Sequence, residues 1–212
     1  MEILPVSAEA EDAAERILLG GRKGGVILVP TETVYGLICA FDDAKARGRI
    51  YSLKHRPAEK HLAAFLPDIS FAERFAPPLS GAALRIARRF MPGPVTLVVP
   101  DGKGSTFGFR IPDHPFILSL LKRVRIPLAS TSANLSGQPP ALDVPGALAS
   151  LDGEPDLAVD GGAIPSGSPA STVILAEPGG QWRILRQGPV TESMIRSVLE
   201  EEPGEGEGRP AT

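Results

Sequence analysis

The sequence predicts a single α/β domain with a twisted, mixed β-sheet that is flanked by helices. Segments with helical periodicity alternate along the chain with short apolar runs of the kind that form buried strands. Several predicted strands follow one another without a helix between them, which favours a mixed sheet over a purely parallel one. At 212 residues the chain can bury a sizeable core. No linker divides the body, so we expect one domain over residues 1–199.

The N-terminal part is predicted to contain two helices and two strands. Apolar residues recur at helical spacing over residues 9–19, and a cluster of glycines ends this helix. The apolar run 25–29 predicts a buried strand. An aspartate pair at 42–43 can cap a second helix that runs to about residue 53, and a short buried strand is expected at residues 62–66.

The middle of the chain repeats this alternation. Ser80 and Gly81 open a helix that has apolar residues on one face up to Phe90. Two prolines and a glycine then break the chain before a strand over residues 95–99. A further strand at 107–111 and an amphipathic helix at 116–124 follow.

The C-terminal part is predicted to be richer in strands. A short strand at residues 128–130 enters a polar loop, and a weak helix is expected near residues 144–151. Thr191 caps a last helix over residues 194–199. The remaining predicted strands are 157–159, 172–175 and 182–185. Residues 200–212 are rich in glutamate, glycine and proline, and we expect them to form a disordered acidic tail.

Charge and composition limit the classes of function. The net charge of −3 is due to the acidic tail, so the body is close to neutral and has no general electrostatic preference for nucleic acid. The sequence lacks the roughly 18 consecutive apolar residues of a membrane helix, and its N-terminus lacks a signal-peptide layout. The single cysteine, Cys39, cannot form an internal disulfide. Together with the missing export signal and membrane helix, this predicts a cytoplasmic protein without membrane contact. The three histidines show no metal-ligand spacing, so no protein-held metal site is predicted.

Small polar residues follow the first predicted strand, in the stretch Pro30-Thr31-Glu32-Thr33-Val34-Tyr35-Gly36-Leu37. Open α/β sheets bind ligands at the carboxyl ends of their strands. The stretch is therefore a candidate binding site. Alternatively, it is an ordinary strand exit in which the hydroxyls cap backbone groups.

Three cationic side chains lie at the end of the second predicted helix, in Lys54-His55-Arg56-Pro57-Ala58-Glu59-Lys60. Cations at a helix C-terminus can simply complement the helix dipole. Pro57, however, favours an extended conformation for Arg56, in which its guanidinium could bind a phosphate or carboxylate.

A second cation is carried by the strand that contains Arg110. Alternation puts the aromatic residues Phe107 and Phe109 on one face, and Thr106, Gly108 and Arg110 on the other. The glycine leaves space beside the arginine. The alternative is an exposed face of an edge strand.

Hydroxyl-rich loops complete the candidate site. The stretch Ser130-Thr131-Ser132-Ala133-Asn134-Leu135-Ser136-Gly137 offers neutral hydrogen-bonding groups with little bulk, as a nucleotide site requires, although an ordinary turn has the same composition. Ser171 and Arg186 add similar groups later in the chain. Anion-binding arginines without a nucleophile–base pair favour binding of a nucleotide and transfer from its phosphates.

These motifs together resemble the YrdC/TsaC family of threonylcarbamoyl-adenylate synthases, in its short single-domain form. The resemblance extends over residues 10–199 and includes the Pro30–Leu37 stretch, Lys54-x-Arg56 and Ser132-x-Asn134. It implies a large, positively lined concave cleft. It also implies synthesis of L-threonylcarbamoyladenylate and pyrophosphate from L-threonine, bicarbonate or CO₂, and ATP, with Mg²⁺ accompanying the ATP. A tRNA threonylcarbamoyl transferase complex would use the product to modify tRNA.

The resemblance also assigns roles to individual residues. Lys54, Arg56, Ser132 and Asn134 would form the catalytic tetrad. L-threonine would be bound by Thr33, Arg110, Ser130 and Ser171. ATP would be bound by Arg56, Lys60, Thr106, Ser132 and Arg186. Because the chain ends at residue 212, we expect it to lack the extra C-terminal domain of the long form and to pass its product to partner proteins.

Two alternatives remain open. The first is a YciO-like paralogue with weak synthase activity and a different role. The second is a non-catalytic protein that binds tRNA or double-stranded RNA through basic residues, for which the candidates are Lys122, Arg123, Arg125, Arg85, Arg88 and Arg89.

Overall fold

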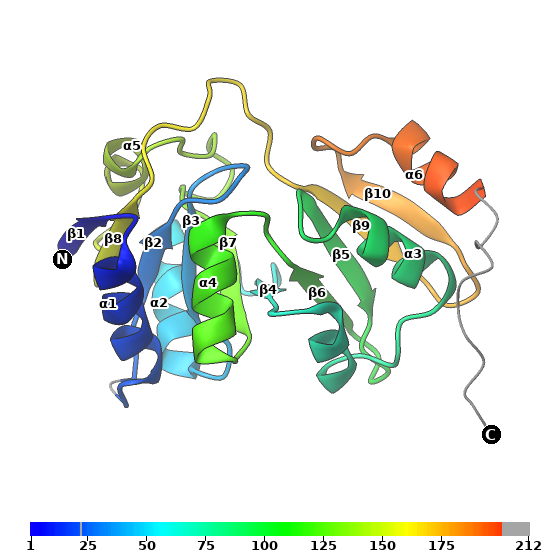
Figure 1. Cartoon of the computed structure of the whole chain (residues 1–212), viewed down its shortest axis with the longest axis horizontal. Coiled ribbons are helices and arrows are strands. Elements are labelled where there is room, and N and C mark those ends of the chain that lie inside the picture. Colours follow the sequence, from blue (N-terminus) through cyan, green and yellow to red (C-terminus); the bar gives the residue numbers. More distant parts are fainter. Residues whose placement is uncertain (22, 201–212) are drawn as a thin grey trace.

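A ten-stranded mixed sheet forms the centre of the computed structural model, which describes residues 1–21 and 23–200. The strand order is β1-β8-β2-β3-β7-β4-β6-β5-β9-β10 (Figure 1). The strands are β1 (Glu2–Pro5), β2 (Ile27–Val29), β3 (Gly36–Ala40), β4 (Ala63–Phe65), β5 (Val95–Pro100), β6 (Thr106–Arg110), β7 (Leu128–Ser132), β8 (Leu157–Asp160), β9 (Thr172–Ala176) and β10 (Trp182–Arg186). The predicted α/β class with a mixed sheet is confirmed.

Six α-helices and one 3₁₀ helix accompany the sheet in the described residues. They are α1 (Ala8–Leu19), α2 (Ala44–Lys54), the 3₁₀ helix Ile69–Arg74, α3 (Gly81–Phe90), α4 (Pro115–Val124), α5 (Val144–Ala149) and α6 (Glu192–Glu200). The side chain of Asp43 accepts a hydrogen bond from the backbone N–H of Ala46, which confirms the predicted cap of α2. Helix α6 includes Glu200, the first residue of the predicted tail. The rest of that tail, residues 201–212, lies outside the described residues.

The two halves of the sheet are covered differently (Figure 1). In the half that contains β1, β8, β2, β3 and β7, helices α1 and α4 pack against one apolar cluster, and α2 and α5 pack against another on the opposite face. In the half that contains β6, β5, β9 and β10, helices α3 and α6 cover a single apolar cluster. The opposite face of this second half is therefore available to line a binding site.

Strand β3 is the main element that the sequence did not reveal. It pairs with β2 in antiparallel orientation, with Val29 opposite Gly36, so the intervening residues form a hairpin loop. Leu37 and Cys39 enter one apolar cluster and Ile38 enters the other. Because both faces of β3 are buried, its residues do not show the alternation by which half-exposed strands are recognised. Strand β1 and the 3₁₀ helix were also not predicted.

The hairpin loop is tied to the segment that connects the two halves of the sheet. The phenol of Tyr35 donates a hydrogen bond to the carbonyl of Gly162 at 2.7 Å and accepts one from the N–H of Gly161 at 3.0 Å. This segment leaves β8 and crosses to β9 (Figure 1). None of the helices in the described residues is long and apolar enough to cross a lipid bilayer.

Candidate functional site

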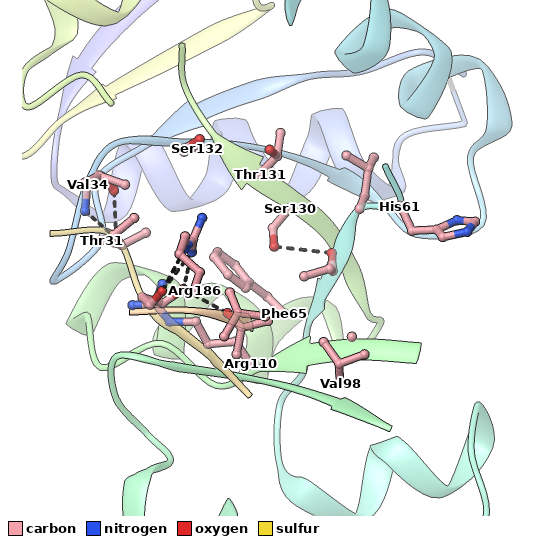
Figure 2. Close-up of a pocket in the computed structure, with 18 of the residues that line it drawn as sticks. Thr31, Val34, His61, Phe65, Val98, Arg110, Ser130, Thr131, Ser132 and Arg186 are labelled. Atoms are coloured by element: carbon pink, nitrogen blue, oxygen red, sulfur yellow. Dashed lines mark hydrogen bonds between the residues drawn. The ribbon is translucent and has the colours of Figure 1, made fainter. Parts of the chain in front are cut away.

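A cavity of about 360 Å³ lies between the two halves of the sheet. One side is formed by alternate residues of β5 and β6, such as Thr96 and Arg110, whose neighbours in sequence face the apolar cluster beneath α3. The other side is formed by β4, the end of β7 and the hairpin loop. Figure 2 shows Arg110 and Arg186 on one side and Ser130, Thr131 and Ser132 on the other. The wider cleft that the family resemblance implies stays a prediction.

Thr31 organises the hairpin loop. Its hydroxyl donates to the carbonyl of Val34 at 2.7 Å and accepts from the N–H groups of Thr33 and Val34, both at 3.2 Å. Since its single proton is directed at Val34, the 3.0 Å contact between the two threonine hydroxyls requires Thr33 to be the donor. The Thr33 oxygen is then free to accept from another group.

That other group is the guanidinium of Arg110. Its NH2 donates to the Thr33 hydroxyl at 3.1 Å, and its Nε donates to the carbonyl of Gly93 at 3.1 Å. Gly93 has a φ of 156°, and an added Cβ would lie 2.6 Å from the carbonyl oxygen of Phe90. The turn after α3 therefore requires glycine here, and it directs the Gly93 carbonyl at the arginine.

Glu32 supplies a counter-charge for Arg110. Its Oε1 lies 2.6 Å from the arginine NH2, and the two side chains are 20% and 6% exposed, respectively. The contact is an ion pair without hydrogen-bond geometry, and neither carboxylate oxygen accepts a hydrogen bond from the residues that the structure describes. Neither Glu32 nor Thr33 is among the lining residues of the cavity. Both contact the NH2 of Arg110 from outside the lining of the cavity.

Arg186 reaches the cavity from the end of β10. Its guanidinium donates to the carbonyl of Ser171 at 2.8 and 3.1 Å and to the Ser171 hydroxyl at 3.0 Å. That hydroxyl also lies 2.9 Å from the hydroxyl of Thr96. Burial lowers the pKa of Arg186, and the charges of Arg110 and Arg56 lower it further. These three guanidiniums therefore share one electrostatic environment.

Arg56 is also held by backbone carbonyls. Its Nε donates to the carbonyl of Lys60 and its NH2 to that of His61, both at 2.8 Å. Burial lowers its pKa, an effect that Tyr51 partly offsets. Arg56 lines the cavity, whereas Lys60 is exposed and is not among the lining residues.

Lys54 is buried beneath the Ser132–Asn134 loop, with 1% of its surface exposed. Its ammonium group donates to the carbonyls of Ser132 and Asn134, and it does not line the cavity. Burial, assisted by the charge of Arg56, lowers the pKa of Lys54 to about 8. The Asn134 amide also shapes this loop, since its Nδ2 donates to the carbonyls of Leu135 and Gln138, both at 2.8 Å. Lys54 and Asn134 thus hold the loop that presents Ser132.

The structure brings together most of the residues that the sequence indicated. The predicted site residues that line the cavity are Arg56, Thr106, Arg110, Ser130, Ser132, Ser171 and Arg186. The predicted residues that do not line it are Thr33, Lys54, Lys60 and Asn134. Sequence reasoning missed Thr96, whose position between the buried residues Val95 and Leu97 is a detectable alternation signal. The ligand roles of all these residues stay predictions.

Other reactive side chains have ordinary structural surroundings. Burial raises the pKa of Cys39 to about 12, so its thiol is unreactive at neutral pH. The Nε2 of His55 lies 2.7 Å from the carboxylate of Asp152 on the surface. In residues 1–21 and 23–200, no three acidic, histidine or cysteine side chains are grouped as metal ligands would be.

The charges around the cavity favour anionic ligands. Three arginines line it, and no aspartate or glutamate is among its lining residues within the described chain. Serine and threonine hydroxyls supply neutral hydrogen-bonding groups beside them. Such a site can bind a carboxylate and a polyphosphate and stabilise charge that moves between them.

Comparison with known proteins agrees with this geometry. The Sua5/YciO/YrdC family model, described as telomere recombination, matches residues 21–188. The threonylcarbamoyl-AMP synthase of Bacillus subtilis is 34% identical over 188 residues, which cover 84% of this chain and 54% of the relative. This chain therefore spans about half the length of that protein.

Solved structures show the same similarity. The structure of Pyrococcus abyssi Sua5 complexed with L-threonine has a TM-score of 0.81 and 30% identity, with 94% of this chain and 61% of that chain covered. Escherichia coli YciO has a TM-score of 0.75 and 26% identity, with 92% and 97% covered. Together with the match to the family model, these likenesses show that the chain belongs to the Sua5/YciO/YrdC family.

Proposed function

We propose that the protein is an L-threonylcarbamoyladenylate synthase, which makes its product and pyrophosphate from L-threonine, bicarbonate or CO₂, and ATP. The observation that carries this proposal is the different pairing of the cavity arginines. Arg110 has a carboxylate partner, whereas the guanidiniums of Arg56 and Arg186 are held by backbone carbonyls and a hydroxyl. The similarity to threonylcarbamoyl-AMP synthases and to a threonine-bound Sua5 supports the choice of substrates.

L-threonine would occupy the part of the cavity next to Arg110. Nε and NH2 of the guanidinium are engaged by Gly93, Thr33 and Glu32, so its NH1 would face the substrate carboxylate. The hydroxyls of Ser130 and Ser171 line the same cavity and would contact the polar groups of threonine. Thr33 would act through Arg110, because its hydroxyl is already engaged there.

ATP would occupy the part of the cavity next to Arg56 and Arg186. These side chains have no carboxylate partner in the described residues, so their positive charge is available to the phosphates. Ser132 and Thr106 would add hydroxyl contacts, and Lys60 would reach the phosphates from its exposed loop. Mg²⁺ would arrive as part of the ATP complex, because it commonly binds to substrate phosphates and water and none of the described residues that line this cavity is a carboxylate.

The reaction requires positioning and charge stabilisation rather than a protein nucleophile. The threonine amine would add to CO₂ and release a proton, giving a carbamate. A carbamate oxygen would then attack the α-phosphorus of ATP, with pyrophosphate as the leaving group. Arg56 and Arg186 would stabilise the charge on the phosphates during this transfer.

The product would be consumed by a tRNA threonylcarbamoyl transferase complex, and the use of ATP fits a cytoplasmic location. The likeness to YciO keeps a paralogue with a different role as the alternative within the family. The RNA-binding alternative has less support. Arg123, one of its candidate residues, is held by Glu11, Asp12 and Glu15 on α1 at 2.6 to 3.2 Å.

The proposal is tested by incubating the purified protein with ATP, bicarbonate and labelled L-threonine, alongside an established synthase. We expect pyrophosphate release that depends on both bicarbonate and threonine, together with a labelled adenylate. No release under conditions in which the established synthase works would overturn the proposal. Salt-sensitive RNA affinity without turnover would instead favour the RNA-binding alternative.

A further inference from the structure

Glu32 occupies an unusual position beside the cavity. Both of its carboxylate oxygens are buried, and neither accepts a hydrogen bond from the described residues. Its close polar contact is with the NH2 of Arg110 at 2.6 Å. A buried carboxylate is costly when it lacks hydrogen-bond donors. Capping the hairpin loop does not explain Glu32, because the hydroxyl of Thr31 already serves that purpose.

The arginines that line the cavity differ in this respect. The guanidiniums of Arg56 and Arg186 donate to the uncharged groups of Lys60, His61 and Ser171. Carbonyls orient a guanidinium but leave its net charge in place. Arg110 also has a carbonyl partner in Gly93, but the carboxylate of Glu32 contacts its NH2 and adds a negative charge. The net field at the Arg110 end of the cavity is therefore weaker.

The difference in net charge between the two ends of the cavity should affect a polyphosphate and a single carboxylate differently. A polyphosphate carries several charges and is attracted to the region with the highest net positive charge. A single carboxylate of a zwitterionic amino acid can instead be recognised by the geometry of the guanidinium, even when a neighbouring carboxylate balances the guanidinium's charge. Arg110 and Arg186 lie close enough for the charge of Arg110 to lower the pKa of Arg186. Without a counter-charge, both would attract phosphate.

We propose that Glu32 is a specificity-determining residue that reserves Arg110 for the carboxylate of the amino-acid substrate and excludes phosphate groups from this end of the cavity. The identity of the amino acid rests on the proposed function. The exclusion of phosphate rests on the ion pair alone. Glu32 is a positioning residue, because it acts through Arg110 and does not line the cavity.

Glu32→Gln tests the proposal, with pyrophosphate as the probe. In the unaltered protein we expect pyrophosphate to bind near Arg56 and Arg186 and to leave threonine affinity unchanged in calorimetric titrations. In Glu32→Gln we expect pyrophosphate to bind roughly tenfold more tightly and to compete with threonine. Unchanged pyrophosphate affinity, or the absence of competition, would overturn the proposal.

Three further variants separate the effect of the Glu32 charge from effects on folding and on overall charge. The double variant Arg110→Met/Glu32→Gln removes both charges, so the gain in pyrophosphate affinity must disappear; its persistence would contradict the role of Arg110. If Glu32→Gln does not fold, Glu32→Asp serves instead, because its shorter side chain moves the negative charge away from Arg110. This variant should show a smaller gain in pyrophosphate affinity, and the absence of any gain would contradict the proposal. Glu177→Gln removes an exposed charge at the β9–β10 turn and should change neither pyrophosphate affinity nor threonine affinity.

A protein that makes no adenylate but shows these binding changes would refute the proposed function and leave this inference standing.

Discussion

Arg110 and the other three cations of the site, Lys54, Arg56 and Arg186, are held by different kinds of partner. Arg110 contacts a carboxylate, a hydroxyl and a carbonyl. Lys54 and Arg56 are held by backbone carbonyls, and Arg186 by a carbonyl and a hydroxyl. The pKa of each of these three is lowered, with burial as the largest cause. A cation held by neutral groups keeps its charge for a ligand, whereas a cation paired with a carboxylate retains mainly its hydrogen-bonding geometry.

The largest effect is expected from Arg110→Ala. Loss of a buried partner for the substrate carboxylate should raise the KM for threonine by roughly 30- to 1,000-fold, with a much smaller change for ATP. Steady-state kinetics with each substrate varied in turn provides the measurement. Arg110→Lys keeps the positive charge but loses the two parallel N–H groups of the guanidinium. Its KM for threonine should therefore lie between the values of the unaltered protein and of Arg110→Ala. Equal effects on threonine and ATP would refute the proposed division of the cavity.

Lys54→Met is expected to reduce stability more than substrate binding. The change removes the ammonium donor that the carbonyls of Ser132 and Asn134 share, which should cost roughly 2 to 5 kcal/mol of unfolding free energy. Urea denaturation measures this quantity, and Lys122→Met, at an exposed position on α4, is the matched control. A variant with normal stability but no ATP binding would place Lys54 in direct contact with the nucleotide instead.

Arg186→Met should act mainly on ATP. Removal of an uncompensated guanidinium is expected to raise the KM for ATP by roughly 10- to 100-fold and to make ATP binding less sensitive to salt. Some effect on threonine is expected too, because Arg186 orients Ser171. Arg183→Met, an exposed neighbour on β10 outside this cavity, should have kinetics close to those of the unaltered protein. A larger increase in the KM for threonine than in the KM for ATP would contradict the assignment of the Arg186 part of the cavity to ATP.

The pH dependence of stability should report the burial of Lys54. Its pKa is lowered from 10.5 to about 8 in the folded protein. Between these values the unfolded chain binds more protons, so the unfolding free energy should rise with pH, with a slope of at most about 1.4 kcal/mol per pH unit from this group. Subtracting the profile of Lys54→Met isolates the contribution. A difference that stays flat from pH 8 to pH 10 would show that Lys54 remains charged in the fold.

The smallest effect is expected from Thr33→Val. The substitution removes the hydroxyl that accepts from Arg110 and should raise the KM for threonine roughly fivefold, without changing that for ATP. The same kinetic assay applies. An effect as large as that of Arg110→Ala would mean that Thr33 contacts threonine directly, as the family resemblance implies, rather than through the arginine.

Local patterns in the sequence revealed much of the fold and of the site. Helical spacing located α1, α3 and α4, and an acidic cap located the start of α2. Alternation along β6 placed Arg110 opposite its aromatic neighbours, as the structure shows. Strand β3 was not predicted, because it is buried on both faces and shows no alternation. Thr96 was not predicted as a site residue, although it follows the same alternation as Arg110.

The sequence by itself determined the residue types of the site, because periodicity and turn chemistry depend on neighbours along the chain. It identified the arginines, the hydroxyl loops and the motifs that mark the family. Only the tertiary structure decided which of these groups line the cavity and which contact the residues that do. Glu32 and Arg110 are far apart in sequence and become partners only when β6 and the hairpin loop meet. Lys54 binds the Ser132–Asn134 loop only after α2 packs beneath it. Such pairings depend on contacts between distant segments, which no local pattern encodes.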